Sequence, residues 1–538
     1  MLPLRSFCQK FWQSGFSVIL AGVLAALSLP PVYLVIILGG CFPFLVKRVE
    51  QSNSYKQAFG LGYLFGLGFY AAGLYWLTNA ILLRVETFWW LVPIVAPLCA
   101  VPLALGPAVS CLLYKCFLKA GTSALQRMFL FAGLWTLADM SRSILLPHAW
   151  WNPILTGFPW NPLASIWAIP GSLGTVLLQP LAWIGGDGLT FLTIFLALSP
   201  LLKVKRAVVL CAVSFLIWFA VGSFRLYGVK LKESRNPIVV LVQGNVSEET
   251  KIHHTTEDAN AILRNYIRLT QEGLREAEKL QKQEQEGQAP SQIQSQNQPR
   301  PIVFAWPETA FPGYLQFYPD LSREMMRHFP QADMGLIGSI RVGEKDHRLR
   351  NSLFVLGREG QIGEIYDKVH LVPFGEYQPA ILPFHVVPGQ GLAAGNAIRT
   401  LHLPVQEPFG ALICYEVVFS HKVVDERDRP SWIINITNDG WYGNSAGPRQ
   451  HLAAVRMRAV EEGLPIARAA NTGITAAYDA LGRQLAWLGW GQKGFVVVAL
   501  PGGVGITFFA RFGLFIPFAL SIVSVGVGLW RRKPVILP

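Results

Sequence analysis

One cysteine in the second half of the chain stands where it could act as a nucleophile. Cys414 lies in the apolar stretch FGALICYEVVF and is the only cysteine after Cys211. It therefore has no nearby partner for a disulfide, and a free cysteine in apolar surroundings is often only a small hydrophobic residue. A nucleophilic role would need a base that removes the thiol proton and donors that stabilise an oxyanion.

Candidates for these partners follow other apolar runs. Glu308 lies in AWPETAF, directly after a strand-like run, and Lys368 and Glu376 share the loop YDKVHLVPFGEYQP, which has too many Pro and Gly residues for a regular helix. Glu416 comes two residues after Cys414, so on a strand both would share one face. Each charge alone fits an ordinary surface residue. Together, a carboxylate, an ammonium group and a thiol favour a nucleophilic role for Cys414 over that of a small hydrophobic residue.

The segment that carries these residues alternates strand-like and helical patterns. Short β-branched runs that end in turn residues cover 237–246, 301–309, 334–342, 352–357, 409–418, 431–439 and 494–501. Helical patterns cover 257–281 and 447–463. This alternation predicts a layered α/β domain whose active-site residues gather at strand ends. Residues 281–300 are rich in Gln, Ser and Pro, which predicts a flexible surface insertion.

The rest of the chain has the composition of a membrane protein. The 538 residues have a mean hydropathy of +0.36 and only 15% are charged, against about 25% in soluble domains. Residues 234–503 hold 26 Lys and Arg against 28 Asp and Glu, so the net charge of +13 comes from the apolar remainder. There, basic residues set membrane topology, which makes nucleic-acid binding a poor explanation of the charge.

Eight stretches are long and apolar enough to predict membrane-spanning helices: 13–29, 31–46, 58–81, 88–114, 126–141, 173–201, 206–226 and 506–530. Basic residues lie at both ends of the chain and in every second connection, as is typical of cytoplasmic loops. We therefore expect both termini in the cytoplasm and residues 227–505 outside. The glycines of 59–73 favour close helix packing, and the aromatic loop 146–167 predicts either an interfacial belt or a wall beside an active site.

Longer strings around the candidate residues match one known family. WPET (306–309), DKVHLVPFGEY (367–377), ICYE (413–416), TNDGWYGNSAGPRQH (437–451), RMRAVE (456–461) and NTGIT (471–475) resemble the bacterial apolipoprotein N-acyltransferases, a membrane branch of the carbon–nitrogen hydrolase (nitrilase) superfamily. The resemblance covers most of 237–503 and extends to FGLGFYAAGLYWL (65–77) and TGFPW (156–160). One departure lies in 244–258, which lacks the tryptophan of some relatives and has Ile252, His253 and His254.

The resemblance implies a fold and a cellular place. We expect a membrane domain of seven transmembrane helices at 1–230, a nitrilase-like αββα sandwich at 237–503, and an eighth transmembrane helix at 504–532. The protein would lie in the bacterial cytoplasmic (inner) membrane, with its catalytic domain on the periplasmic side.

The resemblance also implies a ping-pong reaction without metal or cofactor. Glu308 would be the general base, Cys414 the nucleophile that becomes a thioester, and Lys368 with a backbone N–H near Tyr415 the oxyanion donors. The donor would be the sn-1 acyl chain of a phospholipid, with phosphatidylethanolamine expected. The acceptor would be the N-terminal amine of the diacylglyceryl-cysteine of apolipoproteins.

Supporting roles follow from the same resemblance. Glu376 would orient Lys368 or the incoming amine, and the substrate pocket would include Tyr415, Glu416, Asn438, Trp441 and Tyr442. Two other functions stay open at this point. One is a membrane-tethered amidase of the nitrilase type that uses water as acceptor; the other is a scaffold or transporter whose domain has lost its activity.

Overall fold

The structure, a computed structural model, describes residues 14–83, 85–144, 159–252, 255–286, 299–377, 391–403 and 407–530. The chain divides into two compact units. One is helical and contains the described residues up to Arg225 together with those from Arg511 onward. The other runs from Leu226 to Ala510 and contains all the strands of the described chain.

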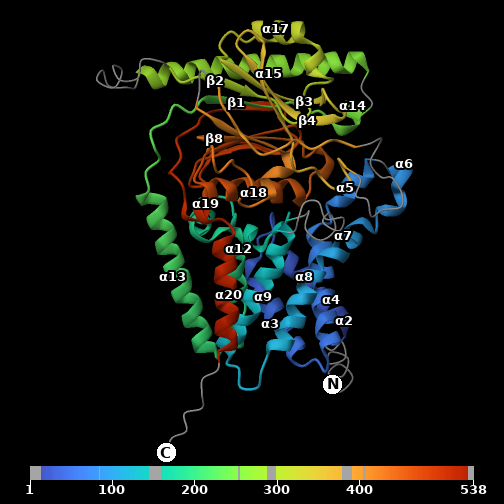
Figure 1. The fold of residues 1–538 in the computed structure, drawn as a ribbon, viewed down its shortest axis with the longest axis vertical. Helices are drawn as coiled ribbons and strands as arrows, with labels where there is room; N and C mark the ends of the chain where they lie inside the picture. Colours follow the sequence, from blue (N-terminus) through green and yellow to red (C-terminus); the bar gives the residue numbers. More distant parts are fainter. Residues whose placement is uncertain are drawn as a thin grey trace, which may run out of the picture. The chain divides into compact units, whose positions relative to one another are not determined.

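The helical unit is built from apolar helices that lie side by side (Figure 1). Its α-helices are α2 (Gly15–Ala26), α3 (Leu38–Glu50), α4 (Tyr55–Gly73), α5 (Leu77–Leu82), α6 (Val85–Phe88), α7 (Val95–Leu103), α8 (Leu105–Phe117), α9 (Ala124–Ile144), α11 (Ser172–Leu178), α12 (Leu181–Ala197), α13 (Val204–Gly228) and α20 (Phe515–Leu529). α13 runs into the second unit by a few residues, and α19 (Phe508–Phe512) lies at the other boundary. Short 3₁₀ helices occupy Val35–Ile37, Trp89–Leu91, Leu163–Trp167 and Ser199–Leu201.

Each of the eight stretches expected to span a membrane contains a helix, although only some meet the criterion of length. Three helical segments among the described residues are long and apolar enough to cross a membrane: Val95–Phe117, which joins α7 and α8, Leu181–Leu201, which joins α12 and the 3₁₀ helix after it, and Val204–Gly228. Gly15–Ala26 and Phe515–Leu529 are apolar but shorter. The structure therefore shows a helical domain with three helices that could span a membrane, and the membrane position and the count of eight spans stay predictions.

Close contact between α2 and α4 explains the glycine-rich stretch in the second of these helices. A Cβ atom on Gly68 would lie 2.1 Å from the carbonyl oxygen of Ile19, and a Cβ on Gly22 would lie 2.1 Å from that of Phe65. Any larger residue at these positions would separate the two backbones. The prediction that these glycines serve helix packing is confirmed.

The aromatic loop 146–167 was expected to form either an interfacial belt or a wall beside an active site. Its described part, from residue 159 onward, does neither. Trp160 is 1% exposed and its ring centroid lies 4.9 Å from that of Trp76. Trp167 is also buried and donates from Nε1 to Thr193 at 2.7 Å. Both rings therefore belong to the core of the helical unit. The prediction differed because a sequence does not show which side of a loop faces inward. Residues 146–158 lie outside the described residues.

The second unit contains two six-stranded sheets. The first has the order β12-β1-β2-β3-β4-β5, and the second β11-β10-β9-β8-β7-β6. In each sheet, three central strands are parallel and the outer pairs are antiparallel. The strands are β1 (Ile238–Gln243), β2 (Ile302–Ala305), β3 (Met334–Val342), β4 (Leu349–Gly357), β5 (Ile362–Asp367), β6 (Thr400–Leu401), β7 (Phe409–Ile413), β8 (Trp432–Thr437), β9 (Ile466–Ala470), β10 (Thr475–Tyr478), β11 (Gln484–Leu488) and β12 (Gly494–Ala499).

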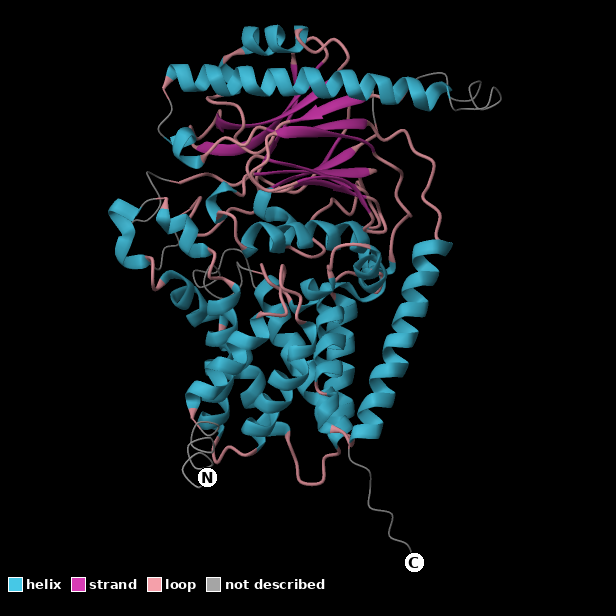
Figure 2. Cartoon of the chain, turned by 180° about the vertical axis from the view of Figure 1, so that it is seen from behind, coloured by secondary structure: helices cyan, strands magenta, loops and turns pink. Residues whose placement is uncertain are grey.

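The two sheets lie face to face with helices on their outer sides (Figure 2). One apolar core lies between the sheets and includes Val239, Val303, Phe409 and Trp432. A second core lies between the first sheet and the helices α15 (Thr256–Glu286) and α17 (Pro319–Arg327). α18 (Ala446–Glu462) covers the second sheet. The unit is therefore an αββα sandwich, as the resemblance implied.

Two local predictions in this unit are wrong. The helix predicted to end near residue 281 continues to Glu286, so the first residues of the expected insertion are helical, and residues 287–298 lie outside the described part. The strand expected over 409–418 ends at Ile413, and Cys414–Val418 form a 3₁₀ helix. The second difference changes the interpretation of Glu416. A short helix α14 (Glu248–Ile252) also follows β1.

Candidate active site

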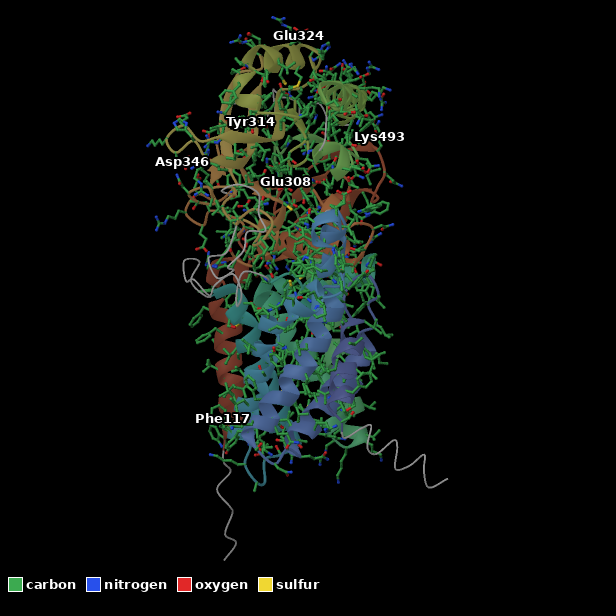
Figure 3. The ribbon with its side chains drawn as sticks, turned by 90° about the vertical axis from the view of Figure 1, so that its right-hand side faces the viewer. Phe117, Glu308, Tyr314, Glu324, Asp346 and Lys493 are labelled. Carbon is green, nitrogen blue, oxygen red and sulfur yellow. The ribbon has the colours of Figure 1, made fainter. Side chains whose placement is uncertain are left out.

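The predicted nucleophile, base and cation all follow strands, as expected. Glu308 comes three residues after β2, Lys368 directly follows β5, and Cys414 directly follows β7. The first two belong to one sheet and the third to the other. Glu308 lies inside the α/β unit rather than on its surface (Figure 3), and it is 6% exposed.

Lys368 joins two carboxylates in a buried network. Its Nζ donates to Oε1 of Glu308 at 3.1 Å and to Oε1 of Glu376 at 2.8 Å. The amide of Asn351 donates to the same two oxygens, at 2.6 Å and 3.1 Å. Burial lowers the pKa of Lys368, but Glu308 and Glu376 outweigh burial and raise it well above its ordinary value. Lys368 is therefore a permanent cation, and Glu376 holds it in place.

Glu308 is held in one orientation by donors on both of its oxygens. Oε1 accepts from Lys368 and Asn351, and Oε2 accepts from the backbone N–H of Asn438 at 2.8 Å. Asn438 follows β8 of the opposite sheet, so its N–H fixes the carboxylate across the sandwich. A carboxylate held in this way would need little reorganisation to accept a proton.

Cys414 has a strained backbone at the end of its strand. Its φ is +52°, in the left-handed region that costs a residue other than glycine about 1–3 kcal/mol. Its side chain is 4% exposed. Burial and then the negative charge of Glu308 raise the pKa of the Cys414 thiol, while Lys368 lowers it. The thiol is therefore protonated at neutral pH and depends on a base, and both Glu308 and Lys368 are near enough to influence its charge.

Glu416 does not share a strand face with Cys414, because the chain turns into the 3₁₀ helix at that point. Its carboxylate instead accepts the backbone N–H groups of Ile413 and Val369, both at 2.6 Å, and that of His370 at 3.2 Å. It also accepts the hydroxyl of Tyr366 at 2.9 Å. Burial raises the pKa of Glu416 to about 7, against the lowering effect of these N–H groups. Glu416 thus ties the cysteine turn to the Lys368 loop.

The other residues expected around the pocket differ in their contacts. Tyr442 is buried, and the pKa of its hydroxyl is raised by burial and then by Cys414. Trp441 is half-buried in the same turn, Gly440–Tyr442. The Tyr415 ring packs edge-on against Phe419 at 5.1 Å. Asn438 holds Glu308 by its backbone and donates from Nδ2 to Glu248 at 2.6 Å, so its described contacts are with the protein.

Several residues of the site carried no predicted role. Besides Asn351 and Glu248, they include Lys251, whose Nζ donates to Thr309 Oγ1 at 3.3 Å. Burial raises the pKa of Glu248 and lowers that of Lys251. Asn351 could not be predicted, because it lies inside a strand and its partners are distant along the chain. Neighbouring His253 and His254 lie outside the described residues.

A buried polar cluster lies behind the nucleophile. His451 Nε2 lies 3.0 Å from the carbonyl oxygen of Cys414, and its Nδ1 lies 2.8 Å from Oδ1 of Asp439. Arg468 donates from Nη2 to Oδ2 of Asp439 at 2.6 Å. Burial raises the pKa of Asp439, but Arg468 and His451 outweigh burial and lower it to about 2. These three side chains are 0% exposed.

Side-chain atoms of Cys414, Asp439 and His451 lie within 4.8 Å of one another, a spacing that could suit a metal ion. Their partners argue for a different use. Asp439 accepts from Arg468, and the two ring nitrogens of His451 face Asp439 and a carbonyl. A metal ion would have to displace these contacts beside a fixed guanidinium charge. We therefore interpret the cluster as a hydrogen-bond network.

Known proteins match both parts of the chain. Residues 251–505 match the carbon-nitrogen hydrolase family, and residues 21–199 match the apolipoprotein N-acyltransferase N-terminal domain. An apolipoprotein N-acyltransferase from Rhodopseudomonas palustris is 31% identical over 97% of this chain and 96% of its own length. One from Bradyrhizobium diazoefficiens is 32% identical over 97% and 95%. The chain belongs to the apolipoprotein N-acyltransferase family.

Solved structures of the nitrilase superfamily also resemble the chain. A cysteine variant of an amidase from Nesterenkonia AN1 shares 16% identity, covers 51% of this chain and 93% of its own, and has a TM-score of 0.33. The NitFhit protein of C. elegans shares 13% identity, covers 54% of this chain and 64% of its own, and has a TM-score of 0.35.

As a member of the apolipoprotein N-acyltransferase family, the chain is an enzyme, an acyltransferase with a carbon–nitrogen hydrolase domain.

Proposed function

We propose that this protein transfers a fatty acyl chain from the sn-1 position of a phospholipid to the N-terminal amine of diacylglyceryl-cysteine in apolipoproteins, through a thioester on Cys414. The observation that carries the proposal is the buried network of Glu308, Lys368 and Glu376, in which Glu308 and Lys368 act electrostatically on the thiol of the strained Cys414. Family membership supports a lipoprotein acceptor and a phospholipid donor. Phosphatidylethanolamine is the expected donor.

In the first half-reaction, Glu308 removes the thiol proton and the Cys414 sulfur attacks the ester carbonyl carbon. The carbonyl oxygen becomes an oxyanion, which accepts hydrogen bonds from Lys368 Nζ and the backbone N–H of Tyr415. When the tetrahedral intermediate collapses, the C–O bond breaks and Glu308 returns its proton to the leaving alkoxide. Lysophospholipid leaves, and an acyl thioester remains. Each oxyanion donor of this kind typically contributes about 10²–10³ in rate.

In the second half-reaction, the amine nitrogen of the lipoprotein attacks the thioester carbon. Glu308 now removes a proton from the amine, and an amide forms as the C–S bond breaks. The thiolate recovers the proton through Glu308, which restores the starting enzyme. The same base therefore serves both halves, and the three donors on its oxygens keep it in place throughout.

The proposed place of the enzyme is the bacterial inner membrane, with eight spans, cytoplasmic termini and a periplasmic catalytic domain. The basic connections between apolar stretches and the three long apolar helices support this topology. It would leave both substrates in the bilayer, which matters because extracting an acyl chain into water costs about 0.8 kcal/mol per CH₂ group.

Mass spectrometry of the purified full-length protein after exposure to phosphatidylethanolamine tests the proposal. An acyl adduct is expected on Cys414, and it should disappear on addition of a diacylated lipopeptide as N-acylated peptide forms. Cys414→Ser should carry no labile adduct, while Cys116→Ser, at an exposed cysteine, should behave like the native protein. Release of free fatty acid without N-acylated peptide would instead support the amidase that uses water.

A further inference from the structure

The cluster behind Cys414 has no part in the mechanism above, although it contacts the nucleophile directly. His451 lies on α18, 37 residues from Cys414, and its ring nitrogen Nε2 contacts the backbone carbonyl oxygen of Cys414. A carbonyl oxygen can only accept a hydrogen bond, so the Nε2 atom of His451 carries a proton whenever this bond is present. This conclusion is independent of whether the ring is neutral or charged.

The other side of the imidazole is fixed by charged groups. Nδ1 lies 2.8 Å from Oδ1 of Asp439 and 3.2 Å from Nη2 of Arg468. Arg468 is itself held by Asn435 Oδ1 at 2.6 Å. Because all these side chains are 0% exposed, water does not compete for them, and the ring has one orientation.

The bond from His451 sets the direction of a neighbouring donor. The carbonyl of Cys414 and the N–H of Tyr415 belong to one planar trans peptide group, so they point in opposite directions. Holding the carbonyl toward His451 therefore turns the Tyr415 N–H away from it. Cys414 has φ +52°, a conformation that its own local preference would not maintain. Glu416 restrains the preceding residue by accepting the Ile413 N–H at 2.6 Å.

We propose that His451 is a positioning residue that aims the Tyr415 backbone N–H at the oxyanion of the acyl-transfer intermediate, with Asp439 and Arg468 holding its ring. The inference rests on the proposed function, since the oxyanion arises in thioester formation. It assigns to His451 a role in stabilising charge on the substrate, although the side chain itself touches only the enzyme.

Two reactions of the same thiol separate this role from simple structural support. Thioester formation passes through a tetrahedral oxyanion, whereas alkylation by iodoacetamide is a direct displacement in which sulfur bonds to a CH₂ carbon and iodide leaves. Alkylation therefore needs an accessible, deprotonated Cys414 but no oxyanion donor. Peptide-resolved mass spectrometry can follow both reactions at Cys414 in the full-length protein, apart from the other cysteines.

The matched substitutions are His451→Gln and His451→Met. The Gln and Met side chains have similar size, but only Gln can donate a hydrogen bond to the Cys414 carbonyl. Met is expected to slow thioester formation about 10²-fold and alkylation less than about 3-fold, while Gln recovers thioester formation to within about 10-fold of the native rate. Val455→Ala removes buried atoms one turn further along α18 and is the control for packing; it should leave both rates unchanged.

Other results would overturn the inference. Equal losses in both reactions, or a Met variant as fast as the native protein, would mean that His451 does not serve the oxyanion. If His451→Met does not fold, Asp439→Asn provides the test, because it keeps the imidazole but weakens its support; it should also slow thioester formation more than alkylation, and equal slowing would contradict the proposal. Failure of the native protein to form any thioester would instead refute the proposed function.

Discussion

Replacing Lys368 by methionine tests whether one cation holds the catalytic network together. The ammonium lies 3.1 Å from Glu308 and 2.8 Å from Glu376, and the three side chains are only 1%, 8% and 14% exposed. Removing one partner of a buried ion pair typically costs about 3–5 kcal/mol, because it leaves an uncompensated charge. Here two carboxylates would be left side by side, so we expect the free energy of unfolding to fall by at least this amount.

A double-mutant cycle isolates the cause. Glu376→Gln in the Lys368→Met background removes one of the two uncompensated charges, so we expect it to recover about 1–3 kcal/mol rather than to add a further loss. Thioester formation should not recover with it, because the oxyanion donor is still missing; both variants should be slowed at least about 10²-fold. Stability and activity therefore separate in the double variant.

Thermal unfolding of the purified protein and mass spectrometry of the Cys414 adduct measure the two quantities. For a domain of this size, a loss of 3–5 kcal/mol lowers the unfolding midpoint by roughly 10 °C. Lys282→Met is the matched control, because Lys282 forms an ion pair with Glu278 at 2.8 Å but is 64% exposed, and such pairs contribute less than about 1 kcal/mol. Additive effects of the two substitutions in the cycle would refute the argument.

Two further outcomes follow from the residues around the nucleophile. Glu416→Gln should lower the free energy of unfolding by about 1–3 kcal/mol, because an amide nitrogen would face backbone N–H groups whose hydrogen bonds the carboxylate now accepts. Thermal melts measure this loss, and a melt like that of the native protein would contradict the prediction. Burial lowers the pKa of His370 from 6.5 to about 4, so the unfolded chain binds a proton at this residue more readily than the folded one. The contribution of His370 to the free energy of unfolding is therefore full above pH 6.5 and falls as the pH drops toward 4, by about 1–2 kcal/mol between pH 7 and pH 5. Thermal melts at these two pH values should show this dependence, and His370→Gln should reduce it.

Much of the sandwich and the three central site residues could be predicted from the sequence. Buried strands are continuous apolar runs that end in turn residues, so the chain itself marks where Glu308, Lys368 and Cys414 leave the sheets. β5, β9, β10 and β11 were missed because Gly, Ala, Arg and Gln interrupt their apolar pattern, and β6 was missed because it has only two residues. Short strands of this kind depend on their neighbours more than on their own composition.

The partners of the site residues were harder to predict. Asn351, Asp439 and His451 contribute through hydrogen bonds to groups that are distant along the chain or belong to the backbone, and a sequence pattern does not report such contacts. Glu416 was expected on the same face as Cys414 because a strand was assumed to continue past Cys414. The turn at φ +52° is held by tertiary hydrogen bonds in which Glu416 accepts from Val369 and His451 contacts the Cys414 carbonyl, so local preference could not reveal it.

The chain order of the two sheets has a consequence for how this enzyme is made. Residues 238–367 supply five strands of the first sheet, so Glu308 and Lys368 are synthesised, and can neutralise each other, before the sulfur-bearing strand exists. Cys414 then arrives with the second sheet, and β12 completes the first sheet last. The first sheet therefore cannot be completed until every strand of the second has been synthesised.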